Sequence, residues 1–259
     1  MLYGEHNWTQ IPDLTDKVAV VPLGSLEQHG RHLPLLTDTI TGAEIARRAE
    51  RELGDAAVFL PTLYLGASDH HLAFPGTVSL HNQTYTQVIS DLVESLIGSG
   101  FRRIVLLNAH GGNSGPATAA LYEIRMRRRD EKDLWLVLAT WYTLAAPHFS
   151  SIEGMVQERL SHSCEMETSL VLALRPELVQ MEDARGCTEP FPSQFYGTTV
   201  EQTSRVVVPK PFDQITETGA LGHPEFATPA KGQALIEIGT QQVVACIQEI
   251  ASWPTMQPH

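Results

Sequence analysis

The sequence predicts an α/β fold in which a mainly parallel central sheet carries helices on its faces. Short apolar runs alternate with longer amphipathic segments as far as residue 140, and this alternation is typical of βαβ units. The length of 259 residues suits one large domain with a sizeable core. Since no repeat or linker divides the chain, we expect a single domain over residues 1–259.

Four apolar runs are the predicted strands. Residues 17–23 (KVAVVPL), 102–108 (RRIVLLN) and 134–140 (LWLVLAT) are almost continuously apolar, as strands buried on both faces are. In the run over residues 57–65, Pro61 indicates an edge strand or a bulge, since proline has no N–H to donate to a sheet.

The predicted helices have apolar residues at helical spacing. Thr41 and Asn82 stand where N-caps are expected, and Gly54 and Pro176 lie beyond the ends of the first and fourth helices. Residues 180–227 are rich in glycine and proline, and we expect them to be irregular, as a rim of the site or a contact between subunits. The helices are expected over residues 41–53, 83–97, 114–129, 163–174 and 231–250.

Composition narrows the function. Lys and Arg number 18 against 30 Asp and Glu, a net charge of −12 that disfavours nucleic acid as a partner. No apolar stretch approaches the roughly 18 residues that span a bilayer, and no signal peptide is evident. Three widely spaced cysteines, at 164, 187 and 246, suit a reducing cytoplasm better than a disulfide framework. We therefore expect a cytoplasmic protein with no membrane partner.

Three polar clusters follow or begin regular elements. The first is EQHGRH at residues 27–32, followed by Asp38, in an expected loop. The second is NAHGGN at residues 108–113, and the third is HSCEME at residues 162–167. Because the carboxyl ends of parallel strands meet at one crevice, the first two clusters are expected to converge there.

Carboxylates and imidazoles together suit Zn, Mn, Fe or Co. Each residue alone has a structural interpretation: a loop histidine forms hydrogen bonds, Asp38 occupies a turn, and Gly111-Gly112 form a tight turn. Their joint occurrence at two strand ends favours a metal site. A bound metal would lower the pKa of a water to about 7 and so make hydroxide available for hydrolysis.

Long segments resemble the three signature stretches of the creatininase (creatinine amidohydrolase) family. They are PLGSLEQHGRHLPLLTD, LLNAHGGNSG and HSCEMETSLVLAL, and GALGHPEFATPAKG is similar to a later stretch. The resemblance covers about residues 20–232. It implies a three-layer α/β/α fold, two divalent metal ions per subunit (Zn, Mn or Fe) and a homohexamer.

The resemblance also implies roles for individual residues. His162 would handle protons, and Glu167 would lie in or beside the metal shell. Asp38 would bridge the two metals. The implied metal ligands are Glu27, His29, Asp38 and His110.

One departure concerns the fifth ligand. Creatininase proper has a Glu ligand where this chain has Gly112, and family members with His-Gly-Gly-Asn use the first Glu of the third motif, here Glu165. Glu165 and Glu167 cannot both face one point on a regular helix, whereas His162 and Glu165 share a face. We therefore expect Glu165 as the fifth ligand, in the His-Gly-Gly-Asn branch of the family.

A second departure concerns the substrate. Creatininase proper closes over creatinine with a Trp and an Asp, but residues 156–160 (VQERL) contain no aromatic residue. Creatinine is therefore not the expected substrate. Other branches that the chain resembles hydrolyse formamides on pyrimidine intermediates or a peptide tail.

The predicted reaction is hydrolysis of an amide C–N bond, in an open or cyclic small molecule, by metal-activated water. His162 would pass a proton to the leaving nitrogen, and the N–H groups of Gly111 and Gly112 would support the oxyanion. The alternatives are a metal-dependent hydrolase of a cyclic ketone or lactone and a non-catalytic metal-binding protein.

His70 and His71 lie outside the signature, in a loop that is expected to overhang the crevice. They are interpreted as structural loop residues, with contact to substrate as the alternative.

Overall fold

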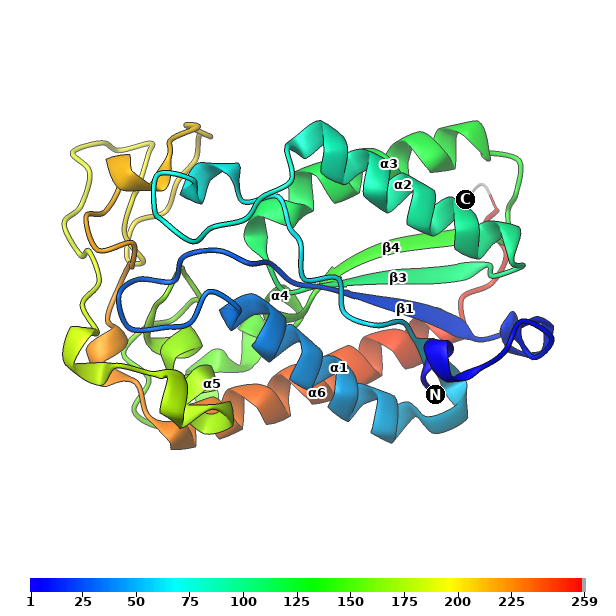
Figure 1. Cartoon of the computed structure of the whole chain (residues 1–259), viewed down its shortest axis with the longest axis horizontal. Helices are drawn as coiled ribbons and strands as arrows, with labels where there is room; N and C mark the ends of the chain where they lie inside the picture. Colours follow the sequence, from blue (N-terminus) through cyan, green and yellow to red (C-terminus); the bar gives the residue numbers. More distant parts are fainter. Residues whose placement is uncertain (258–259) are drawn as a thin grey trace.

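The four predicted strands form one parallel sheet in the order β2-β1-β3-β4 (Figure 1). The structure is a computed structural model that describes residues 1–257, so the last two residues of the domain expected over 1–259 lie outside the described part. The strands are β1 (Val18–Leu23), β2 (Ala57–Phe59), β3 (Arg103–Asn108) and β4 (Trp135–Thr140).

The edge strand β2 is shorter than predicted. It ends at Phe59, two residues before Pro61, and the chain then follows β1 with only single hydrogen bonds, such as Leu63 N–H to Pro22 O at 2.9 Å. Pro22 lies inside β1, and its carbonyl points toward the side where β2 has already ended. Proline has no N–H to donate, but at this position there is no paired strand on that side, so Pro22 costs the sheet no hydrogen bond.

Within residues 1–257, six α-helices complete the fold. On β1, Val18 and Val20 pack into the core beside α1 and α6, whereas Ala19 and Val21 pack into the core beside α2 and α3. Because successive side chains of a strand point to opposite faces, this division confirms the three-layer α/β/α fold (Figure 1). Within residues 1–257, none of the helices is both long and apolar enough to cross a membrane. The helices are α1 (Thr37–Leu53), α2 (Asn82–Gly98), α3 (Ser114–Arg127), α4 (Trp141–Ala145), α5 (Glu165–Leu174) and α6 (Pro229–Ala251).

Helix α1 begins four residues earlier than predicted. Thr37 is its first residue, so Thr41 is not a cap and Asp38 lies in the first turn instead of a loop. A carboxylate is favourable there because the amino end of a helix carries partial positive charge. Asn82 is likewise the first residue of α2 and not its cap. Gly54 ends α1 with φ +53°, as predicted for the glycine beyond a helix.

The long irregular segment was predicted correctly. Residues 180–227 contain short 3₁₀ turns and an isolated bridge between Cys187 and Leu221. In Figure 1 this segment, yellow to orange, gathers at the end of the molecule where β3 and β4 end. It therefore lies beside the crevice in which the sequence places the site.

Candidate metal centre

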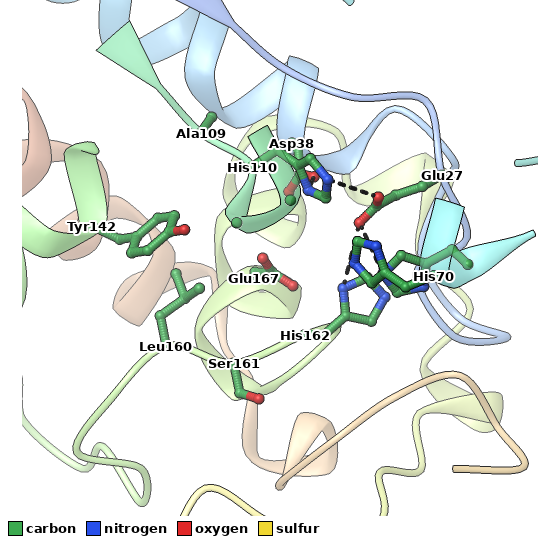
Figure 2. A pocket seen from close by; sticks show the side chains of 13 residues that line it. Glu27, Asp38, His70, Ala109, His110, Tyr142, Leu160, Ser161, His162 and Glu167 are labelled. Carbon is green, nitrogen blue, oxygen red and sulfur yellow. Dashed lines mark ion pairs between the residues drawn. The ribbon is translucent and has the colours of Figure 1, made fainter. Parts of the chain in front are cut away.

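The first two polar clusters meet around Asp38. His29 Nε2 lies 3.3 Å from Asp38 Oδ1, and His110 Nδ1 lies 3.0 Å from Asp38 Oδ2. His110 Nε2 in turn lies 3.2 Å from Glu27 Oε2 (Figure 2). Glu27 and His29 follow β1, Asp38 begins α1 and His110 follows β3, so the expected convergence at the strand ends is present.

The donor atoms in this cluster fit a divalent cation. Among residues 1–257, both carboxylate oxygens of Glu27 and Nε2 of His29 are buried and have no hydrogen-bond partner. Burying a carboxylate without partners is costly, and coordination of a metal removes that cost. Ligand atoms of Glu27, His29 and Asp38 lie within 4.8 Å of one another, close enough to share one ion.

Electrostatics agree with a site for positive charge. Burial by itself lowers the pKa of His29, but the charges of Asp38, Glu167 and Glu27 overcome it and raise the pKa to about 10. Burial also raises the pKa of Glu167 to about 8, against the opposing charge of His29. Carboxylates packed this closely create a negative potential that a metal cation would neutralise.

Glu167, not Glu165, faces the cluster. Glu167 Oε2 lies 3.7 Å from His29 Nε2 and accepts the Ser163 N–H at 2.5 Å. Ser163 has φ +53°, outside the helical region, so α5 begins at Glu165 and not at Ser163 as predicted. The expectation that His162 and Glu165 share a helix face therefore does not apply.

Both carboxylate oxygens of Glu165 are bonded to groups outside the cluster. Its Oε1 lies 2.6 Å from Lys231 Nζ, and its Oε2 accepts the N–H groups of Val156 and Gln157, both at 2.9 Å. The carboxylate thus joins α5, α6 and the preceding loop. Glu165, the predicted fifth ligand, therefore points away from the cluster, toward a lysine and two amides that the motif does not contain.

Gln28 orients His71. The Gln28 side chain is fixed because its Oε1 accepts the Gly30 N–H at 2.8 Å and its Nε2 donates to Gly219 O at 3.0 Å. Nε2 also lies 2.8 Å from Nδ1 of His71, which must therefore accept. The proton of neutral His71 is then on Nε2, 3.4 Å from Glu27 Oε1. His71 therefore turns a proton toward Glu27 without forming a hydrogen bond to it.

His162 has the opposite arrangement. Its Nε2 donates to the backbone oxygen of Gln28 at 2.9 Å, so its Nδ1 is unprotonated and lies 3.7 Å from Glu27 Oε1. Burial, together with the charges of His29 and His71, holds the pKa of His162 well below its usual value. His162 is therefore a neutral imidazole whose free lone pair faces the cluster, as a proton acceptor requires.

The cluster lines a cavity of about 240 Å³. Tyr142, from α4, and Leu160 and Ser161 form the wall opposite the carboxylates (Figure 2). His70 and His71 also line it, so the loop expected over the crevice reaches the cavity. The signal for them is positional, because their loop leaves the carboxyl end of β2 toward the same crevice.

The comparisons with known proteins agree with the motifs. The family model described as "Creatininase: Creatinine amidohydrolase" matches residues 4–247. The chain belongs to the creatininase family. A mycofactocin precursor peptide peptidase from Mycobacterium tuberculosis (strain CDC 1551 / Oshkosh) is 30% identical over 259 residues, covering 96% of this chain and 90% of that protein. The creatinine amidohydrolase of Pseudomonas putida is 30% identical over 246 residues, covering 90% of each.

Solved structures give the same family. A crystal structure of creatinine amidohydrolase (creatininase) has a TM-score of 0.80 and 26% identity, covering 98% of both chains. Two similar creatininase structures are described as "Creatininase Mn" and as a variant of "Zn-Zn type". The chain is thus a creatininase-family amidohydrolase with a candidate metal site, and its substrate is a separate question.

Within this family, Gly112 has a structural explanation. A Cβ at this position would collide with Ala67 O and His110 Nε2, so the backbone leaves no room for the Glu of creatininase proper. Asn113 beside it donates to Gly24 O at 3.0 Å and accepts the Ala67 N–H at 3.0 Å. The His-Gly-Gly-Asn motif therefore holds three loops together around the cavity.

Proposed function

We propose that this chain is an amidohydrolase that uses two divalent metal ions. The observation that carries the proposal is the position of Asp38 between two imidazoles, beside a buried carboxylate without hydrogen-bond partners. Glu167, which faces the cluster, takes the place of Glu165 in the proposed ligand set, and Asp38 would be the ligand shared by both metals. The proposed ligands are Glu27, His29, Asp38, His110 and Glu167.

The side chains of the chain itself supply proton transfer and positioning. Bound metal would supply a Lewis acid for the amide carbonyl and a water of lowered pKa. His162 Nδ1 accepts a proton on the cluster side and delivers it to the leaving nitrogen, while the Gln28 carbonyl holds the ring. Gly111 and Gly112 line the same cavity, and we keep their N–H groups as the proposed oxyanion donors.

The family and the cavity wall support an amide substrate. One relative is a peptide peptidase and another a creatinine amidohydrolase, so both break a C–N bond. Of residues 156–160 only Leu160 lines the cavity, and Tyr142 is an aromatic side chain in the same wall, so the proposal includes both open and cyclic amides. A homohexamer in the cytoplasm remains part of the proposal, and sedimentation of the purified protein measures the subunit number.

Metal analysis with a matched pair of variants tests the proposal. We expect about two Zn, Mn or Fe ions per chain and hydrolysis of at least one compound in a panel of formamides, cyclic amides and short peptides. Asp38→Ala should lose both the metal and turnover, because one carboxylate serves both ions. Asp130→Ala removes an exposed carboxylate and should change neither.

Two results would contradict the proposal. Lactone or cyclic ketone turnover without any amide turnover would favour the alternative hydrolase. Folded, metal-loaded protein that hydrolyses none of these compounds would favour a non-catalytic metal-binding protein.

A further inference from the structure

A second hollow adjoins the metal cavity. It measures about 410 Å³, and Leu160 and Ser161 line both spaces. These two residues immediately precede His162, so the wall between the hollows is next to the proposed proton-transfer residue. A substrate with its amide at the metals can therefore extend past Leu160 and Ser161 into the second hollow.

The lining of the second hollow carries positive charge and no negative charge. It contains hydroxyl and main-chain groups of residues 196–200 and 202–204, with Ile215 and Leu221 as apolar contacts. None of its lining residues is an Asp or Glu, although the chain carries a net charge of −12. Its single charged side chain is Arg159.

Arg159 is held in place without being neutralised. Its Nε donates to Val200 O at 2.6 Å, and its Nη2 donates to Gln202 O. Within residues 1–257 it forms no ion pair with a carboxylate closer than 4 Å. Carbonyl oxygens fix the guanidinium but leave its charge and its Nη1 group available, and a fixed guanidinium suits carboxylate or phosphate oxygens.

A separate hollow that Arg159 also lines is unsuitable for an anion. Its lining includes Glu158 and Glu201, and Glu201 Oε1 pairs with His223 Nε2 at 3.1 Å. These carboxylates would repel an anion from that hollow. The hollow beside the metal cavity, which has no Asp or Glu in its lining, is therefore where an anion would meet Arg159.

We propose that Arg159 and this second hollow form a subsite for an anionic group, a carboxylate or a phosphate, on the part of the substrate beyond the amide that is broken. This inference rests on the proposed amidohydrolase function. It names a substrate class, an amide with an anionic end, and it identifies Arg159 as a specificity-determining residue.

Binding of matched probes to the metal-loaded full chain tests the subsite. The carboxylate pair is N-acetyl-alanyl-alanine and its C-terminal amide; the phosphate pair is adenosine 5′-monophosphate and adenosine. Titration calorimetry should show about tenfold tighter binding of the charged member of one pair, because only that member forms a charge-assisted hydrogen bond with the fixed guanidinium. The pair that shows the preference identifies the anion.

Variants assign the preference to Arg159. Arg159→Gln should abolish it, and Arg159→Lys, which keeps the charge without the planar fork, should retain part of it. Arg205→Gln is the control. Arg205 directly follows the lining residues 202–204 and donates to Gln194 O at 2.8 Å, but it does not line the hollow. Thermal melting checks that each variant is folded. If Arg159→Gln is not folded, the comparison of Arg159→Lys with the parent decides whether Arg159 causes the preference.

Several outcomes would overturn the inference. These are no preference in either pair, a preference that survives in Arg159→Gln, and an equal loss in Arg205→Gln. Loss of the preference after chelation of the metal would also overturn it, because the anion would then be bound to the metal. Every experiment on the subsite measures binding of a probe and not turnover. Absence of bound metal or of turnover would therefore contradict the proposed function, but not this subsite.

Discussion

Asp38 is held from three directions. Besides the two imidazoles, its Oδ2 accepts the hydroxyl of Ser25 at 2.7 Å. Burial would raise the pKa of this carboxyl, but the charges and hydrogen bonds of His29 and His110 hold it well below its usual value. Asp38 is therefore ionised at neutral pH, as a ligand shared by two cations must be.

Substitution of His162 should affect turnover without affecting metal binding. His162→Ala removes the free imidazole lone pair but none of the proposed ligands, so we expect metal content to be unchanged and kcat to fall by about 10²–10⁴-fold. Metal analysis and initial rates on the best amide of the panel measure both. His148→Ala, at an exposed position, is the control. Turnover of His162→Ala at the parent rate would remove His162 from the mechanism.

At the scale of elements, α5 separates two neighbouring glutamates. Residues two apart on a helix point in different directions, so Glu167 faces His29 while Glu165 faces Lys231 of α6. The same helix thus carries a proposed metal ligand and a buried structural ion pair. The spacing in the sequence predicts that only one of the two glutamates can reach the proposed metals, but it does not predict which one.

Paired substitutions distinguish these roles. Glu165→Gln leaves Lys231, whose side chain is 11% exposed, without its charge partner, and should lower the free energy of unfolding by about 3 kcal/mol with metal content retained. Glu167→Gln should lower metal content with a smaller loss of stability. Denaturant unfolding and metal analysis measure the two effects. The opposite result, metal loss in Glu165→Gln alone, would restore Glu165 as the ligand.

At the scale of the whole molecule, buried neutral histidines should make stability depend on pH. Burial, with the nearby charge of His29, lowers the pKa of His32 to about 4. Between about pH 6.5 and pH 4 the unfolded chain binds a proton that the folded chain does not. The contribution of His32 is therefore complete above pH 6.5 and is lost as the pH falls, by up to about 3 kcal/mol.

His32→Gln tests this directly. The difference in unfolding free energy between pH 7 and pH 4.5 should be smaller in this variant than in the parent, because one group no longer titrates. His148→Gln, at an exposed position, should behave like the parent. Equal pH dependence of the parent and His32→Gln would show that His32 titrates alike in both states.

The sequence predicted the layers and the motifs, and it misplaced several boundaries. Apolar periodicity located β1, β3 and β4 because a strand covered on both faces must be apolar throughout. It could not place the start of α1, since Thr37 and Asp38 are polar residues whose helical conformation depends on their contacts. It also missed α4, whose five residues are too few for a periodic pattern.

By itself, the sequence determined the parallel sheet, the family and three residues that gather around Asp38, since strand ends bring loops together whatever the loops contain. Only the tertiary structure showed which of Glu165 and Glu167 faces the cluster, because Lys231 lies 66 residues from its partner in the chain. It also showed that His70 and His71 line the cavity and that Arg159 lies beside residues 196–200 and 202–204. A side chain in a loop points where distant atoms allow, and one-dimensional spacing does not record those atoms.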